Sequence, residues 1–263
     1  MSFGAVLTSA EPHESGLALS IPADWHQGRT AYGGFSAALA LAAAATVARP
    51  IGDDLPPLRS IEVGFVGPLA GEVVATARVL RQGRNATWVA VEITSEGKVG
   101  LTASLVFMRP VESRLQLNRM LPPQGLIPPE EAAPFDFSHA PAFRRQHFEV
   151  RFALPRSEEK RPELCWWVRL RDGEGLDPFT VPLLCADALP PGVMPLLARG
   201  TPISSMHWHS GFLTGTPRTR DGWWLLRSAP DHAGHGCSSQ RMELWNADGE
   251  PVIAGMQSVA LFG

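Results

Sequence analysis

The longest apolar run of the chain has the composition of a helix. Residues 31–49 are rich in Ala and Leu, carry Gly33-Gly34 near their start and stop before Pro50, which predicts a helix ended by a proline. The stretch 34–47 contains no charged side chain and is apolar nearly all round. A helix of this kind is expected to be covered on most sides by other elements.

The segments that follow have the pattern of strands. They are rich in Val, Thr, Phe and Trp, and turns containing Gly, Pro or charged residues separate them. The four predicted strands lie at 58–66, 72–82, 86–94 and 99–108. One buried helix followed by an antiparallel meander is therefore the first predicted unit.

The same order of elements recurs later in the chain. Residues 109–141 hold many prolines and show little periodicity, which is typical of a linker. Beyond them, 178–189 predicts a second helix, ended by Pro190-Pro191. Strands are predicted at 143–153, 164–171, 203–213, 223–228, 236–245 and 252–261. The repetition predicts an N-terminal domain at 1–110, a proline-rich linker at 111–141 and a C-terminal domain at 142–263.

Two pairs of adjacent tryptophans lie on predicted strands of the second unit. They are Trp166-Trp167 and Trp223-Trp224. Neighbouring residues of a strand point to opposite faces of its sheet. We therefore expect one ring of each pair to be exposed or to lie in a contact between subunits.

Charge and cysteine content limit the partners of the chain. The net charge is −3, and the aromatic residues are not interleaved with Lys or Arg runs, so nucleic acid is not an expected partner. The most apolar run, 35–48, is too short to span a bilayer, and no apolar leader follows a basic start, so no membrane insertion is expected. Cys165, Cys185 and Cys237 are odd in number and widely spaced, which predicts reduced thiols in a cytoplasmic protein.

Several short phrases, taken in order, are similar to one known family. In the first half they are Tyr32-Gly33-Gly34, LRSIEVGFVGP at 58–68 and VLRQGR at 79–84; in the second half they are WNADG at 245–249 and VIAGMQ at 252–257. The chain thereby resembles the thioesterase II-like acyl-CoA thioesterases from about residue 16 to its C-terminus.

The resemblance implies an α+β fold called the double hot-dog. In this fold, two antiparallel sheets, each wrapped around a central helix, form a pseudo-dimer in one chain. The implied activity is hydrolysis of an acyl-CoA to a free acid and CoA, without a cofactor. A homodimer or a higher homo-oligomer is also implied, because contacts between subunits would protect the exposed edges of the sheets.

The resemblance further implies which residues hold the hydrolytic water. The family places an Asp on the second helix, a Thr at the start of the next strand and a Gln on the last strand. Asp187 and Gln257 match this pattern, and Ser205 stands where the Thr is expected, keeping the hydroxyl. The apolar neighbours of Asp187 predict a raised pKa, which suits a general base. Because the first helix has no carboxylate, we expect one active site per chain, with the N-terminal half forming a wall of the acyl pocket.

Each of these candidates also has a simpler structural interpretation. Asp187 ends a helix just before Pro190. Gly34 is either an oxyanion donor at the first helix's start, letting substrate approach the backbone, or part of a tight turn. His207 and His209 share a face of one strand, and at least one of them is predicted to line the pocket near Ser205. A metal is not expected, because no third ligand stands at a convincing spacing.

Two other kinds of function stay open from the sequence. A non-catalytic acyl-CoA-binding or lipid-binding hot-dog protein would fit the change from Thr to Ser and the His-x-His strand. Dehydratase or hydratase chemistry with an Asp and a His is a weaker alternative, because the order of elements does not pair them clearly. A serine hydrolase or a dinucleotide-binding protein is disfavoured, because neither Gly-x-Ser-x-Gly nor Gly-x-Gly-x-x-Gly is present.

Overall fold

The computed structural model describes residues 1–48, 55–138, 140–155, 157 and 159–262. The N-terminal half contains α1 (Phe3–Thr8), β1 (Glu11–His13), β2 (Gly16–Ile21), β3 (His26–Gln27), β4 (Thr30–Ala31), α2 (Gly33–Val47), β5 (Leu58–Phe65), β6 (Gly71–Gln82), β7 (Ala86–Ser95) and β8 (Lys98–Met108). The C-terminal half contains α3 (Ala142–His147), β9 (Phe148–Phe152), β10 (Leu164–Leu170), α4 (Thr180–Ala186), β11 (Ile203–Phe212), β12 (Trp223–Gly234), β13 (Cys237–Asn246) and β14 (Pro251–Leu261).

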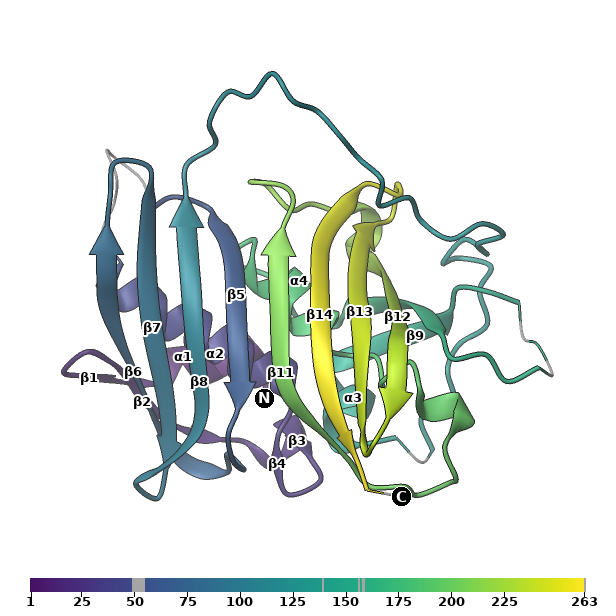
Figure 1. The fold of residues 1–263 in the computed structure, drawn as a ribbon. Helices are drawn as coiled ribbons and strands as arrows, with labels where there is room; N and C mark the ends of the chain where they lie inside the picture. The colour runs from purple at the N-terminus through teal and green to yellow at the C-terminus, as the bar shows by residue number, and fades with distance from the viewer. Residues whose placement is uncertain (49–54, 139, 156, 158, 263) are drawn as a thin grey trace.

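One large antiparallel sheet runs through both halves (Figure 1). Its strand order is β1-β2-β6-β7-β8-β5-β11-β14-β13-β12-β10-β9. The first six strands belong to the N-terminal half and the last six to the C-terminal half. Counted from its outer edge, each half has the same order: its first two strands, then its last three strands in chain order, then the strand that follows its helix. The two sheets expected from the sequence are thus joined, because β5 and β11 pair antiparallel and each covers the edge that the other would expose.

The helices lie on one face of this sheet, behind the strands in Figure 1. The long helix α2 packs on β6, β7 and β8, and α4 packs on β10, β12 and β13. The two helices also pack against each other. Small Ala side chains on α2 allow this close approach, and ten of its residues are buried. None of the helices in the described ranges is long and apolar enough to cross a membrane.

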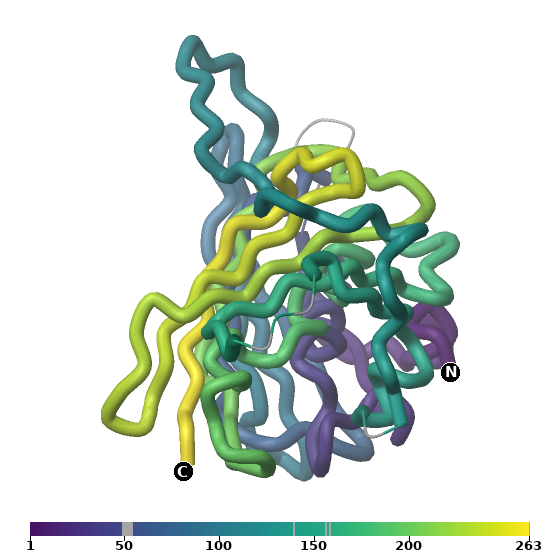
Figure 2. The backbone as a smooth tube through the Cα atoms, turned by 90° about the vertical axis from the view of Figure 1, so that its right-hand side faces the viewer, coloured from purple at the N-terminus to yellow at the C-terminus, as the bar shows by residue number. Residues whose placement is uncertain are grey.

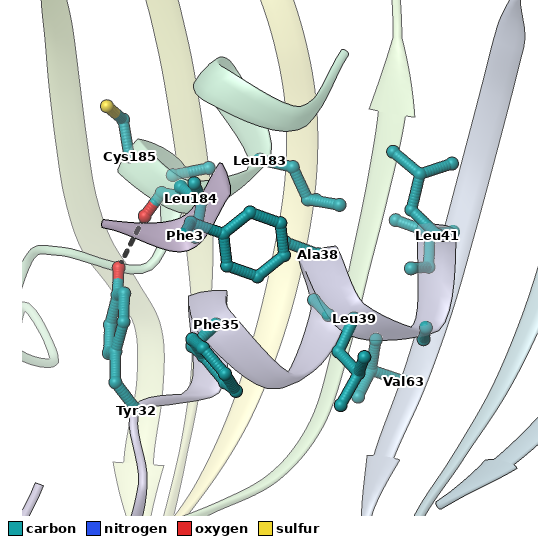
Figure 3. Packing of buried hydrophobic residues seen from close by; sticks show 14 of the residues in the cluster. Phe3, Tyr32, Phe35, Ala38, Leu39, Leu41, Val63, Leu183, Leu184 and Cys185 are labelled. Carbon is teal, nitrogen blue, oxygen red and sulfur yellow. Dashed lines mark hydrogen bonds between the residues drawn. The ribbon is translucent and has the colours of Figure 1, made fainter. Parts of the chain in front are cut away.

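The start of α2 is fixed against α4 by a tyrosine (Figure 3). The Tyr32 hydroxyl donates a hydrogen bond of 2.7 Å to the Leu184 carbonyl. Its ring stacks on Phe143 of α3, with 4.1 Å between the ring centroids. This contact joins the two halves where their helices meet.

Most predicted elements lie within a few residues of the observed ones, with some informative differences. The predicted strand 143–153 is α3 followed by the shorter β9, because Phe143 turns inward against Tyr32 and the chain coils after Pro141. The second helix is shorter than 178–189 and ends where Asp187 leaves the helical conformation. The elements before α2 were not predicted. Arg49, His139 and Gly263, which belong to predicted segments, lie outside the described residues.

The linker covers part of the outer face of β10, β12 and β13, and Figures 1 and 2 show it leaving β8 and crossing to the C-terminal half. Its carbonyls at Ile127 and Met120 accept hydrogen bonds of 2.8 Å and 2.9 Å from the indole nitrogens of Trp167 and Trp245. The expectation that one tryptophan of each adjacent pair is exposed was wrong. Each of the four has an exposed fraction of 5% or less, because this chain segment, and not solvent, meets the outer rings.

Trp245 should therefore contribute much more stability than a tryptophan outside the covered face. Trp245→Ala leaves a cavity under the linker and an unpaired Met120 carbonyl, so we expect a loss of about 3–5 kcal/mol in the free energy of unfolding. The matched control is Trp88→Ala, since Trp88 is 38% exposed and its loss should cost under about 1 kcal/mol. Urea unfolding measures both, and equal losses would contradict the packing of the linker.

Candidate active site

A cavity of about 500 Å³ opens between the two halves of the chain. Its walls come from the β3–β4 hairpin, the start of α2, the segment after β5, helix α3, the segment after α4, and the strands β11 and β14. Among the lining residues are Arg29, Gly33, Phe65, Leu69, Arg144, Asp187, Met194, Ser204, Ser205, Gln257 and Val259. The volume lies in the range of pockets that hold small molecules and cofactors.

Asp187 reaches this cavity because α4 ends there. Its φ of −99° and ψ of 8° leave the helical region, so its side chain stands at the C-terminal end of an apolar helix. The carboxylate faces the N-terminal end of α2, where the Gly34 backbone N–H donates to it. A helix N-terminus carries partial positive charge, so this placement favours the ionised carboxylate. The Gly34 amide, which was predicted as an oxyanion donor, thus donates to the Asp187 carboxylate.

The two glycines that open α2 are required by close neighbours. A Cβ atom at Gly33 would collide with Asp187 Oδ2 and would lie 3.1 Å from the Phe65 ring. A Cβ atom at Gly34 would lie 2.7 Å from the ring of Tyr32. The pair therefore allows the backbone of α2 to approach the carboxylate directly.

A chain of side-chain amides holds the other side of Asp187. Gln257 Nε2 donates to Asp187 Oδ1 at 3.0 Å, and Gln240 Nε2 donates to Gln257 Oε1 at 2.9 Å. The backbone N–H of Gly192 donates to Gln240 Oε1 at 3.0 Å. Gln240 is opposite Gln257 on neighbouring strands, and both side chains are buried. The sequence placed Gln257 at the site, but Gln240 was not identified.

The surroundings of Asp187 bring its protonation into the neutral range. Burial raises the pKa of its carboxyl from 3.8 to about 7. The hydrogen bonds from Gln257 and Gly34 and the charge of Arg144 oppose that rise in pKa. A carboxyl with this pKa can accept a proton from water near neutral pH and later release it.

Ser205 lines the same cavity, although its hydroxyl is not joined to the amide chain. It is opposite Val259 in the β11–β14 pair, and Val259 is fully buried on the face that carries the helices. Within the described residues, the Ser205 hydroxyl makes no hydrogen bond to Asp187 or Gln257. The structure thus brings all three candidates to one cavity and links two of them directly.

His207 lies away from this cavity, which corrects its expected position beside Ser205. The register of β11 shifts between Ser205 and His207, so His207 is opposite Ser258 and not on the face of Val259. This irregularity turns the strand, and His207 and His209 are both exposed on the outer face. Among the described residues, no group of three or more His, Cys, Asp or Glu could hold a metal ion.

Arg144 is a cavity residue that the sequence analysis missed. It lies on α3, is only 7% exposed, and donates from Nη2 to the Ala188 carbonyl at 2.8 Å. Burial lowers the pKa of its guanidinium, and the charge of Asp187 opposes that change. Arg144 directly follows Phe143 and begins a polar run that ends at His147, so the sequence carries no signal that separates it from its polar neighbours.

Family models match most of the chain. The model of the acyl-CoA thioesterase N-terminal domain matches residues 21–108, and the model of the acyl-CoA thioesterase C-terminal domain matches residues 123–261. No curated protein matches the chain in sequence.

Several solved structures share the fold. A conserved protein of unknown function with a hot-dog fold from Alicyclobacillus acidocaldarius has a TM-score of 0.87 and 22% identity, covering 100% of this chain and 99% of its own. The acyl-CoA thioesterase II TesB2 from Mycobacterium marinum has a TM-score of 0.77 and 18% identity, with coverage of 99% and 98%. The dehydratase domain of PpsC from Mycobacterium tuberculosis, solved with C12:1-CoA, is more distant, with a TM-score of 0.53, 15% identity and coverage of 88% and 84%.

Alanine at Gly33 should destabilise the protein, because its methyl group must displace the Asp187 carboxylate or the Phe65 ring. We expect Gly33→Ala to lower the free energy of unfolding by about 1–3 kcal/mol. The control is Gly4→Ala on α1, where the nearest atom to a new Cβ is a Leu176 carbon at an ordinary 3.5 Å. That variant should gain up to about 1 kcal/mol. Urea unfolding at pH 8 measures both, and a gain for Gly33→Ala would refute the close approach.

Proposed function

Since the chain belongs to the acyl-CoA thioesterase family and is a thioester hydrolase, we propose that Asp187 is the base that activates water for the hydrolysis of an acyl-CoA. Gln257 and Ser205 orient the water and the thioester in the cavity. The products are a free acid and CoA.

One observation carries this proposal. Asp187 is the cavity carboxyl whose pKa is raised to about 7, and Gln257 Nε2 holds it at 3.0 Å. A general base is most useful when its pKa lies near the working pH, since it is then ionised and still a strong proton acceptor. Titratable groups perturbed in this way are typical of functional sites.

The chemistry follows from the positions of the donors and acceptors. The Asp187 carboxylate takes a proton from water while the water oxygen forms a bond to the thioester carbonyl carbon. The resulting tetrahedral oxyanion is stabilised by hydrogen-bond donors, for which the second Nε2 hydrogen of Gln257 and the Ser205 hydroxyl are available. As the intermediate collapses, the C–S bond breaks, and protonated Asp187 returns the proton to the CoA thiolate.

The walls of the cavity suit the two ends of an acyl-CoA. Phe65 and Met194 offer apolar surface to the acyl chain and the pantetheine arm. Arg29, exposed on the β3–β4 hairpin, lies where a phosphate of CoA can meet a cation. Both halves contribute to the site, in keeping with the expected role of the N-terminal half as a pocket wall.

A second candidate function is acyl-CoA binding without efficient hydrolysis. It is favoured by the Ser205 hydroxyl, which makes no hydrogen bond to Asp187 within the described part of the chain. A hydroxyl that does not contact the base is free to turn away from water, and this would slow turnover while leaving the pocket intact.

Cytoplasmic location and homo-oligomerisation stay predictions.

Asp187→Asn should abolish hydrolysis, because an amide cannot accept the proton of water. CoA release from acyl-CoAs of graded chain length, followed with a thiol reagent, should fall by at least about 1,000-fold in kcat. The control is Asp177→Asn, just before the start of α4, where the side chain accepts a hydrogen bond from the Phe179 amide. A wild type that binds acyl-CoA but releases no CoA would support the binding function, and an active Asp187→Asn would remove Asp187 as the base.

The rate of hydrolysis should depend on pH through Asp187. The base is the ionised form, so kcat is expected to rise with pH through the pKa of about 7 and to level off above it. Below that pKa, each unit of pH should lower kcat about tenfold. A profile that stays flat from pH 5 to 8 would show that a group with a lower pKa, or none, limits the reaction.

A further inference from the structure

We infer that Gln240 is a positioning residue that sets the direction of the Gln257 amide and so keeps a donor facing Asp187. This inference rests on the proposed function, because it concerns the same base. Gln240 is 0% exposed and lies behind Gln257 as seen from Asp187, so it acts through Gln257 and not on the substrate.

The direction of the whole amide chain is set at one end by a backbone group. The Gly192 N–H can only donate, so the group of Gln240 that meets it must be the carbonyl oxygen Oε1. The Gln240 amide nitrogen then points to Gln257, where it can only meet the oxygen Oε1. Gln257 is left with its nitrogen toward Asp187 Oδ1. A single N–H therefore decides three hydrogen bonds in sequence.

Local packing supports this arrangement at Gly192 and at Gln240. The Gly192 amide is shared between Gln240 Oε1 and the Ser228 hydroxyl, at 3.0 Å and 2.9 Å. A Cβ atom at Gly192 would collide with the Ser228 carbonyl, so only glycine brings the backbone this close. The Gln240 nitrogen also lies 3.5 Å from the sulfur of Met242, a weak acceptor that suits a donor.

Without Gln240, the donor that holds Gln257 Oε1 is lost, and within the described residues the contact with Asp187 alone favours the present direction of the amide. A rotation of half a turn about its last torsion would present Oε1 to Asp187, and two oxygens can share that contact only if the carboxyl is protonated. The base would then be ionised only at higher pH, and the second Nε2 hydrogen would no longer point into the cavity. Both effects lower the rate of water activation without altering the pocket walls.

The other groups that face Asp187 do not hold the Gln257 amide in place of Gln240. Arg144 from α3 and the Gly34 N–H from α2 both favour the ionised carboxylate, while the buried Tyr32 hydroxyl lies nearby as a neutral group. None of them bonds to Gln257 within the described residues. Besides Asp187 itself, Gln240 is therefore the group in the described structure that holds the Gln257 amide in this direction.

The test compares three variants by their pH profiles of kcat and KM for CoA release. Gln240→Met has a similar volume but no donor and only a weak acceptor. It should lower kcat about tenfold and raise the apparent pKa of the kcat profile by about one unit, with KM changed less than about twofold. Gln240→Glu, when ionised, can only accept, so it should force the reversed direction and lower kcat at least as much. Ser228→Ala removes the other acceptor of the same Gly192 amide and should leave the profile unchanged.

A direct titration separates this inference from the proposed function. The carboxyl carbon of Asp187, followed by ¹³C NMR, reports its pKa whether or not the protein is catalytic, and urea unfolding shows that each variant is folded. A raised Asp187 pKa in Gln240→Met supports the inference even if wild type releases no CoA, which would refute the proposed function alone. If wild type hydrolyses acyl-CoA while the folded Gln240→Met and Gln240→Glu keep its kcat and its Asp187 pKa, the inference is overturned.

Discussion

The contact between the Asp187 carboxylate and the start of α2 is the interaction on which the rest of the site depends. A carboxylate in partly buried surroundings is costly unless hydrogen-bond donors surround it. Here the Gly34 N–H donates from the N-terminal half, while Gln257 donates from the C-terminal half. The glycine pair lets the helix backbone approach closely enough, so neither half alone supplies this environment.

The continuous sheet explains why the two halves can hold such a contact. Pairing of β5 with β11 closes both inner edges and fixes the halves in one register. With that register set, α2 and α4 meet on the same face, and the Tyr32 hydroxyl reaches the Leu184 carbonyl. The cavity lies where the helix ends meet, so the two halves of a duplicated architecture contribute unequally to it.

Much of the architecture was readable from local patterns. The uncharged stretch 34–47 predicted a covered helix, and the alternating runs predicted most strands of both halves to within a few residues, because periodicity reflects which face of an element is buried. The exceptions are β12, which extends to Gly234, and the predicted strand 143–153, whose first part is the helix α3. The pairing of β5 with β11 and the position of the linker over Trp167 and Trp245 were not readable. They depend on contacts between segments far apart in the chain, and a ring buried by a linker has the same local sequence as an exposed one.

The sequence by itself determined the chemical types at the site: Asp187 at the end of an apolar helix, Ser205 on the following strand and Gln257 on the last strand. Only the tertiary structure decided which of them meet. An irregularity of one residue in β11 sends His207 to the outer face, and the fold brings Arg144 and Gln240 to or behind the cavity from segments with no motif. The physical reason is that side-chain identity is a local property, whereas burial, strand register and the direction of a hydrogen bond are set by partners that the fold brings together.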